Sequence, residues 1–242
     1  MSDAGYYKSN PRAMSLREMA RMRGWLRLPL TYSVARFAAP IPEGWMPQTW
    51  AELECTEAEL SPQCLKVAEP YREMFCSLGF GEVGFKKGRR LLNPHHRDNG
   101  GINFLDRGRR YFGQLIYAKF HAPPPVRRDR EQMVIGFTAV FEKKVLSCSN
   151  NTKTAFDAVP WHQTVRIASN DVAGIYRHFV DAVVRHKEKP RQFEDLQALQ
   201  NWFDQDVERV FEHRLRRKLY LRMNDEEVVS ARRKLPPLLP KA

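Results

Sequence analysis

The chain has 242 residues, of which 43% are hydrophobic, and its 40 basic residues outnumber 28 acidic ones to give a net charge of +12. This composition excludes a disordered chain, a collagen and a coiled-coil rod, and the length suffices for one large domain or two small ones with a buried core. No run of 18 uncharged apolar residues is present, so we expect no membrane-spanning helix.

The four cysteines are scattered along the chain without a C-x-x-C pair. This usage fits a reducing compartment, and the paired spacing of a structural zinc site is missing. The N-terminus lacks the uninterrupted apolar stretch of a secretory signal. We therefore predict a cytoplasmic protein with no bound metal or cofactor.

The first elements are a short basic helix and a proline-rich stretch. Ser15 and Glu18 have the spacing of a capping box, and Pro29 should end the helix that this box opens. The prolines between this point and Trp50 favour an extended arm lying on the rest of the protein.

Apolar residues at helical spacing next predict a helix that begins near Ser61 and stops at Gly79. The pattern then switches to a period of two, which is typical of strands. The expected strands lie around residues 83–85, 91–92, 102–105, 111–120, 133–141, 145–149 and 163–168. Their short links favour an antiparallel meander.

Helical spacing returns after the strands. One helix begins near Asn170 and ends near Pro190, a longer one carries Leu196 to Leu215, and Asn224 frames a short last helix. The sequence thus predicts an α+β fold: an antiparallel meander of about five or six strands with helices packed on one face, preceded by an extended N-terminal arm.

Three segments follow from this interpretation. Residues 1–60 form the basic helix and proline-rich arm, residues 61–223 a single α+β domain, and residues 224–242 a short helix with a proline-rich tail. Glycines in residues 79–84 match G-x-G-x-x-G, but a helix precedes them and a strand follows. A dinucleotide site needs the reverse order, so we interpret these glycines as a helix stop and an entry into the sheet.

The basic excess is concentrated in the centre of the chain. Residues 86–130 carry 12 basic and 3 acidic residues, whereas residues 41–85 carry 2 basic and 8 acidic ones. Part of the upstream negative charge should neutralise part of the central positive charge inside the fold.

The leading functional hypothesis is an intracellular binding or accessory domain that engages an anionic partner, either nucleic acid or an acidic protein, through basic hairpins with interleaved aromatic residues. This hypothesis requires that the basic side chains gather on one outward face. The candidate contact residues are Lys86, Lys87, Arg89, Arg90, Arg107, Arg109, Arg110, Arg127, Arg128 and Arg130.

Two alternatives remain open. His95, His96 and Asp98 concentrate groups able to bind a metal or transfer protons, which suggests a hydrolase-like enzyme. Basic and apolar residues also alternate in residues 15–28, so this helix has the composition for weak contact with an anionic membrane or with a partner subunit. Whether the chain is an enzyme, and its oligomeric state, stay undetermined. No known family is identified from these residues.

Overall fold

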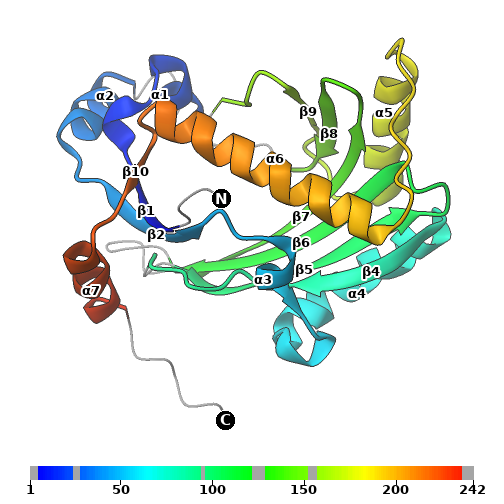
Figure 1. The fold of residues 1–242 in the computed structure, drawn as a ribbon, viewed down its shortest axis with the longest axis horizontal. Coiled ribbons are helices and arrows are strands. Elements are labelled where there is room, and N and C mark those ends of the chain that lie inside the picture. The colour runs from blue at the N-terminus through cyan, green and yellow to red at the C-terminus, as the bar shows by residue number, and fades with distance from the viewer. Residues whose placement is uncertain (1–4, 24–27, 94–95, 122–128, 152–156, 236–242) are drawn as a thin grey trace.

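Seven strands form the central sheet of the computed structural model, which describes residues 5–23, 28–93, 96–121, 129–151 and 157–235 (Figure 1). The strand order is β3-β4-β5-β6-β7-β8-β9, and the α+β prediction is confirmed. The strands are β3 (Glu54–Cys55), β4 (Phe80–Lys86), β5 (His96–Asp106), β6 (Tyr111–His121), β7 (Asp129–Val140), β8 (Val145–Ser149) and β9 (His162–Arg166).

Pairing is antiparallel from β3 to β8, as the short links between strands predict, but β8 and β9 are parallel. The expected meander therefore stops one strand early. A parallel neighbour requires a crossover rather than a hairpin, and residues 150–161 provide that connection. The crossover is held to helix α6 (Leu196–Arg216), because the Asp206 carboxylate accepts from Trp161 Nε1 at 3.0 Å and lies 2.9 Å from His162 Nε2.

Two helices cover one face of the sheet: α4 (Pro62–Ser77) and α5 (Val172–Val184). Ser61 begins α4 by accepting the Cys64 N–H, and Gly79 follows its end with φ of +87°, a conformation that glycine adopts without strain. Pro70 lies inside α4. The sequence signals for the beginning and end of this helix are thus confirmed.

Aromatic stacking joins α4 to the sheet. The Phe75 ring lies 4.4 Å from Phe104 on β5 and 4.8 Å from Phe137 on β7, stacked on both. All three side chains are completely buried. Each such pair contributes about 1 kcal/mol beyond the burial of its area, so this cluster fixes which face of the sheet α4 covers.

Helix α6 crosses the opposite face of the sheet (Figure 1). A second apolar cluster lies between this helix and the sheet. Leu105 and Phe112 alternate with the core residues of the same strands and so point the other way. They pack with Leu199 of α6 and with Trp50, the first residue of the short helix α3 (Trp50–Leu53). The sheet is therefore enclosed between α4 and α5 on one side and α6 on the other.

The N-terminal segment folds more regularly than the predicted arm. Its elements are β1 (Gly5–Ser9), η1 (Pro11–Ala13), α1 (Leu16–Arg23), α2 (Leu28–Phe37), β2 (Ile41–Met46) and η3 (Glu57–Glu59). Two elements from the C-terminal part of the chain pack with them: β10 (Tyr220–Arg222) and α7 (Asp225–Arg233). The capping box of α1 is present, since Ser15 and Glu18 bond each other's backbone N–H.

Strand β1 is the centre of a small sheet of order β10-β1-β2, which joins the two ends of the chain. The proline-rich stretch supplies α2 and β2 in place of an extended arm, because β1 gives β2 a strand to pair with. Pro29 lies in the first turn of α2, where a proline needs no hydrogen-bond donor. None of the helices in the described residues has the length and apolar content to cross a membrane.

The close approach of Gly113 to the core gives a stability prediction. A Cβ at Gly113 would lie 2.4 Å from Phe75 Cε1, whereas a Cβ at Gly136 on the neighbouring strand would meet Ser149 Cβ at 3.7 Å, an ordinary contact. We expect Gly113→Ala to lower the free energy of unfolding by about 1–3 kcal/mol through overpacking. The matched Gly136→Ala should be neutral or slightly stabilising. Urea unfolding measures both, and equal effects would contradict the assigned packing.

Candidate functional site

The basic residues predicted to bind an anion lie at two opposite ends of the sheet. Lys86, at the end of β4, pairs with Gly101, whereas Phe80, at its start, pairs with Asp106. The β5–β6 turn, residues 107–110, is therefore at the far end of the sheet from residues 86–90. Strand β4, which separates them, has seven residues and spans about 23 Å, so these two groups do not form one patch.

Lys86 is buried, with 9% of its surface exposed, and is not available to a partner. Its Nζ lies 3.4 Å from the centroid of the Trp50 ring and 3.6 Å from that of Phe203 on α6. No described residue accepts a hydrogen bond from this Nζ. Burial lowers the pKa of Lys86 to about 7, against the opposing effect of the nearby Asp204 and Glu54 carboxylates.

Desolvation decides the charge state of this amine. The two aromatic faces favour the ammonium by about 1–2 kcal/mol each. The fall of the Lys86 pKa from 10.5 to about 7 corresponds to about 5 kcal/mol in favour of the neutral amine. Burial also raises the pKa of Asp204, whose Oδ1 accepts a hydrogen bond from the backbone N–H of Trp50 at 2.6 Å. Both partners thus shift toward their neutral forms.

The cations that follow Lys86 contact the acidic segment upstream. Lys87 Nζ donates to the Glu59 carbonyl at 2.7 Å, and Arg89 donates to the Glu54 carbonyl at 3.0 Å. The Arg89 guanidinium lies 3.5 Å from the Glu59 carboxylate, and that of Arg90 lies 3.6 Å from Glu52. The expected neutralisation between the acidic and basic segments occurs here, so this end of the sheet presents a mixed rather than a positive surface.

The other residues predicted to carry function lie at the end of the sheet where β5 and β7 begin, or outside the described residues. Arg130 is exposed on β7, next to the β6–β7 connection, while Arg127, Arg128 and His95 lie outside the described residues. His96 begins β5 opposite Phe120, and its side chain is likewise outside the described part.

Asp98 has a structural contact. Its carboxylate accepts a hydrogen bond from the Ser61 hydroxyl, which in turn accepts the Cys64 N–H at 3.1 Å. Asp98 therefore orients the residue that caps α4. Within the described ranges, no three His, Cys, Asp or Glu side chains come together in a group able to hold a metal ion.

The opposite end of the sheet gathers cations that are far apart in sequence. The β5–β6 turn carries Arg107, Arg109 and Arg110, and the β7–β8 turn lies at the same end because Tyr111 pairs with Ala139. The segment after α5 crosses both turns: Arg191 N donates to the Val140 carbonyl at 2.7 Å, and Phe193 N donates to that of Arg109 at 2.9 Å. Phe193 is buried and holds this segment on the second apolar cluster.

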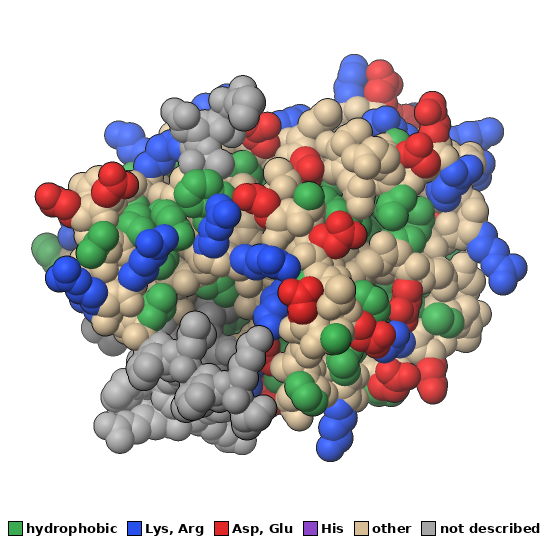
Figure 2. All heavy atoms as spheres, turned by 60° about the horizontal axis from the view of Figure 1, so that its bottom comes forward, with side chains coloured by type: hydrophobic (Ala, Val, Ile, Leu, Met, Phe, Trp, Pro, Cys, Tyr) green, Lys and Arg blue, Asp and Glu red, His purple; other side chains and the backbone are tan. Residues whose placement is uncertain are grey.

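We call this surface the cationic end. All nine of its cations are exposed, and none forms an ion pair with a carboxylate of the described residues. Five acidic side chains lie on the same segments, residues 106–110, 142–144 and 185–195, so the net charge is +4. The right-hand rim of Figure 2, the side of α5 and the start of α6 in Figure 1, shows projecting basic side chains. The nine are Arg107, Arg109, Arg110, Lys143, Lys144, Arg185, Lys187, Lys189 and Arg191.

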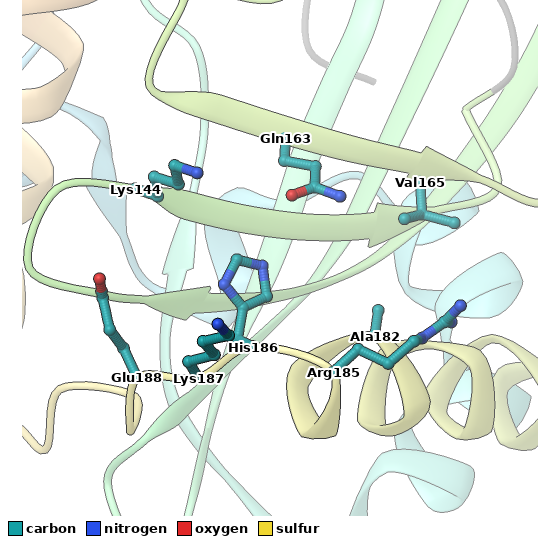
Figure 3. A pocket seen from close by; sticks show the side chains of 8 residues that line it. All are labelled: Lys144, Gln163, Val165, Ala182, Arg185, His186, Lys187 and Glu188. Carbon is teal, nitrogen blue, oxygen red and sulfur yellow. The ribbon is translucent and has the colours of Figure 1, made fainter.

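A pocket of about 620 Å³ opens beside these turns, between β9 and the end of α5 (Figure 3). The His186 ring stacks on Phe141 at 4.3 Å, which places His186 at the edge of the core. Three cations and one carboxylate make the charged part of the lining. The lining residues are Lys144, Gln163, Val165, Ala182, Arg185, His186, Lys187 and Glu188.

Sequence reasoning identified the arginines of residues 107–110 but missed the six cations that join them. The signal was present for the β7–β8 turn, because alternate turns of an antiparallel meander lie at the same end. The segment 185–191 gave no such signal, since only its hydrogen bonds to the two turns place it there.

No family model, no curated protein and no solved structure matches this chain.

Lys86 generates a prediction on the pH dependence of stability. Its pKa is lower in the folded protein than in the unfolded chain, so the unfolded chain binds more protons between about pH 7 and 10. The free energy of unfolding should therefore gain a contribution of a few kcal/mol as the pH rises through this window. Urea unfolding at several pH values measures it.

The variant Lys86→Met keeps the apolar stem and removes the amine. We expect it to be more stable than the wild type at pH 7, with the difference vanishing toward pH 10. Lys66→Met, at an exposed position of α4, is the control and should show a difference that does not vary with pH. A constant difference for Lys86→Met as well would contradict the burial of a neutral amine.

Proposed function

We propose that the protein is a binding or accessory domain for an anionic partner, and that the partner contacts the cationic end of the sheet. One observation carries this proposal: nine exposed cations from three separate segments lie together, without ion pairs to the described carboxylates. Guanidinium groups bind phosphate or carboxylate oxygens in pairs, and five of the nine are arginines.

The positive charge of the cationic end is larger than the partial negative charge of the helix terminus beside it. The end of α5 points its carbonyl groups at the pocket, which amounts to about half a negative charge. The net charge of +4 on the three segments is several times larger. The cations therefore do more than balance the helix dipole, and they set the sign of the potential at this end.

Charge, rather than stacking, is the chemistry that this surface offers. Phe141 and Phe193 are buried, at 2% exposure each, so neither presents a face to a nucleobase. The aromatic residues whose interleaving suggested base stacking in the sequence also pack inwards: Phe104 and Phe112 are buried, and the Tyr111 ring contacts Phe179 of α5. Recognition of carboxylate or phosphate groups needs no such platform.

Charge reversal at the two ends tests the proposal. The triple variant Arg107→Glu, Arg110→Glu, Lys144→Glu alters the cationic end, and Lys87→Glu, Arg89→Glu, Arg90→Glu makes the same change of net charge at the opposite end. We expect the first to weaken binding of a fluorescein-labelled single-stranded DNA of about 20 nucleotides or of polyglutamate by at least tenfold. Anisotropy titrations measure the affinity between about 50 and 200 mM salt.

The opposite-end triple variant is the matched control and should change the affinity far less. For the DNA probe, the slope of log affinity against log salt should fall by about 2 in the first variant, since up to three phosphate contacts are removed. Equal losses in both variants would mean that only total charge attracts the probe. Absence of binding to both probes would overturn the proposal.

We also propose a second, weaker contact through α2, which follows the residues 15–28 suggested by the sequence, because Met19 and Ala20 of that segment are buried. Val34 and Phe37 of α2 are 61% and 82% exposed, lie one turn apart, and flank the exposed Arg36. Exposed apolar side chains beside arginine suit an anionic membrane surface.

The expected effect of Val34→Ser with Phe37→Ser is loss of co-sedimentation with phosphatidylcholine vesicles that contain phosphatidylserine. Val184→Ser, which removes an exposed apolar side chain from α5, is the control and should leave co-sedimentation unchanged. Equal sedimentation of both variants, or of the wild type with vesicles lacking phosphatidylserine, would contradict this contact.

A further inference from the structure

Strand β9 is the outermost strand of the seven-stranded sheet, and no described strand pairs with its outer side. The hydrogen bonds to β8 fix its orientation: the Trp161 carbonyl accepts the Val145 N–H at 2.8 Å, and Ile167 N donates to Ser149 at 3.0 Å. Alternate residues of a parallel strand bond to the same neighbour. Thr164, at the centre of β9, therefore points its N–H and C=O away from β8.

The pocket of the cationic end lies along this open edge. Gln163 and Val165 of β9 direct their side chains toward the end of α5, where Lys144 and Arg185 line the other parts of the pocket (Figure 3). A strand paired with β9 would run beside these two residues. Its alternate side chains would then reach the same pocket, because side chains of adjacent strands point to the same face at paired positions.

We propose that β9 accepts an extended acidic segment of a partner protein as an additional strand, with alternate acidic side chains directed at Lys144, Arg185 and Lys187. This inference rests on the proposed function and assigns its partner class. The charge of the pocket selects acidic side chains, and the exposed edge at Thr164 selects a polypeptide. A DNA backbone supplies acceptors but no donor for the Thr164 carbonyl, whereas every second amide of an added strand supplies one.

Two of the features that protect a sheet edge, a proline and a bulge, are absent from β9. The strand has the sequence HQTVR, without a proline, and its five paired positions in β8 show no register shift. Thr164 and Gln163 are both exposed. An unprotected edge that lies next to a cationic pocket favours addition of an acidic strand over addition of a second copy of the chain, because a second β9 would bring like charges together.

A proline at the central edge position tests the backbone pairing. Thr164→Pro removes the outward N–H while leaving the bonds to β8, which use the neighbouring residues, and edge strands tolerate proline at such a position. Thr164→Ala keeps the N–H and is the matched control. The probe is a fluorescein-labelled synthetic peptide of alternating glutamate and threonine. We expect Thr164→Pro to weaken its binding by about tenfold and Thr164→Ala by less than twofold.

The peptide itself supplies a second control. Methylation of the backbone nitrogens at every second residue removes the donors on one edge of the peptide only. A second peptide, methylated at the remaining nitrogens, lacks the donors on the opposite edge. One of the two methylated peptides should lose most of its affinity and the other should keep it. Hydrogen exchange at the Thr164 amide should slow in the complex with the unmodified peptide.

The outcomes separate this inference from the proposed function. If the charge-reversed cationic end loses peptide binding while Thr164→Pro and both methylated peptides bind as the parent does, the anionic contact stands and strand addition is wrong. If single-stranded DNA binds and Thr164→Pro leaves its affinity unchanged while the peptide fails to bind, the partner is a nucleic acid and the inference is overturned. If neither probe binds, both proposals fail.

Discussion

The long antiparallel ladder of β5, β6 and β7 determines the end of the sheet at which the charged β5–β6 and β7–β8 turns lie. The β6–β7 pairing continues through 11 residue pairs without a shift, and β5 pairs with β6 over nearly its full length. A slip of one residue would move Phe104 and Phe137 from the face that carries Phe75 to the face under α6. The aromatic stack therefore fixes the register, and the register assigns each turn to one end of the sheet.

Charge is separated along this same axis. The acidic residues of α3, β3 and η3 pack where β4 ends, because β3 pairs with β4 through Glu54 and Lys86. Exposed pairs such as those of Arg89 and Arg90 contribute at most about 1 kcal/mol each to stability. Their larger effect is to cancel the positive field at that end. The overall charge of +12 therefore does not show how unevenly charge is distributed between the two ends of the sheet.

Local signals in the sequence predicted the local structure well. The capping residues Ser15, Ser61 and Asn224 each begin a helix, and Gly79 follows the end of another. The strands from β4 to β9 follow the period-two pattern, whereas the strand expected at residues 91–92 is only an isolated bridge between Leu91 and Gly44. The small sheet of β10, β1 and β2 was missed, because β10 has three residues and its partner in β1 lies more than 200 positions away in the chain. Nothing local to Tyr7 or Tyr220 signals that pairing.

The candidate site shows the same limit at the level of a single side chain. Lys86 belongs to the basic run by composition, yet it alternates with Phe85, which packs on the core, and so points at Trp50 and α6. Its environment comes from three elements distant in sequence. By contrast, the shared end of the 107–110 and 142–144 turns follows from the predicted meander alone. The meander geometry and the charge pattern, both readable in the sequence, are therefore sufficient to assign the two groups of cations to different ends of the sheet.

The parallel pairing of β9 is what brings an open edge to the cationic end. Had β8 and β9 formed a hairpin, β9 would begin at the opposite end, beside Ser149. Instead the crossover returns the chain, held by Asp206 to α6 and by Glu18, whose Oε1 accepts the Asp157 N–H at 2.8 Å. His162 consequently starts β9 beside Val145, directly after the turn that carries Lys144. The exposed edge and the charged pocket are thus two results of one crossover, which is why we assign them to one partner.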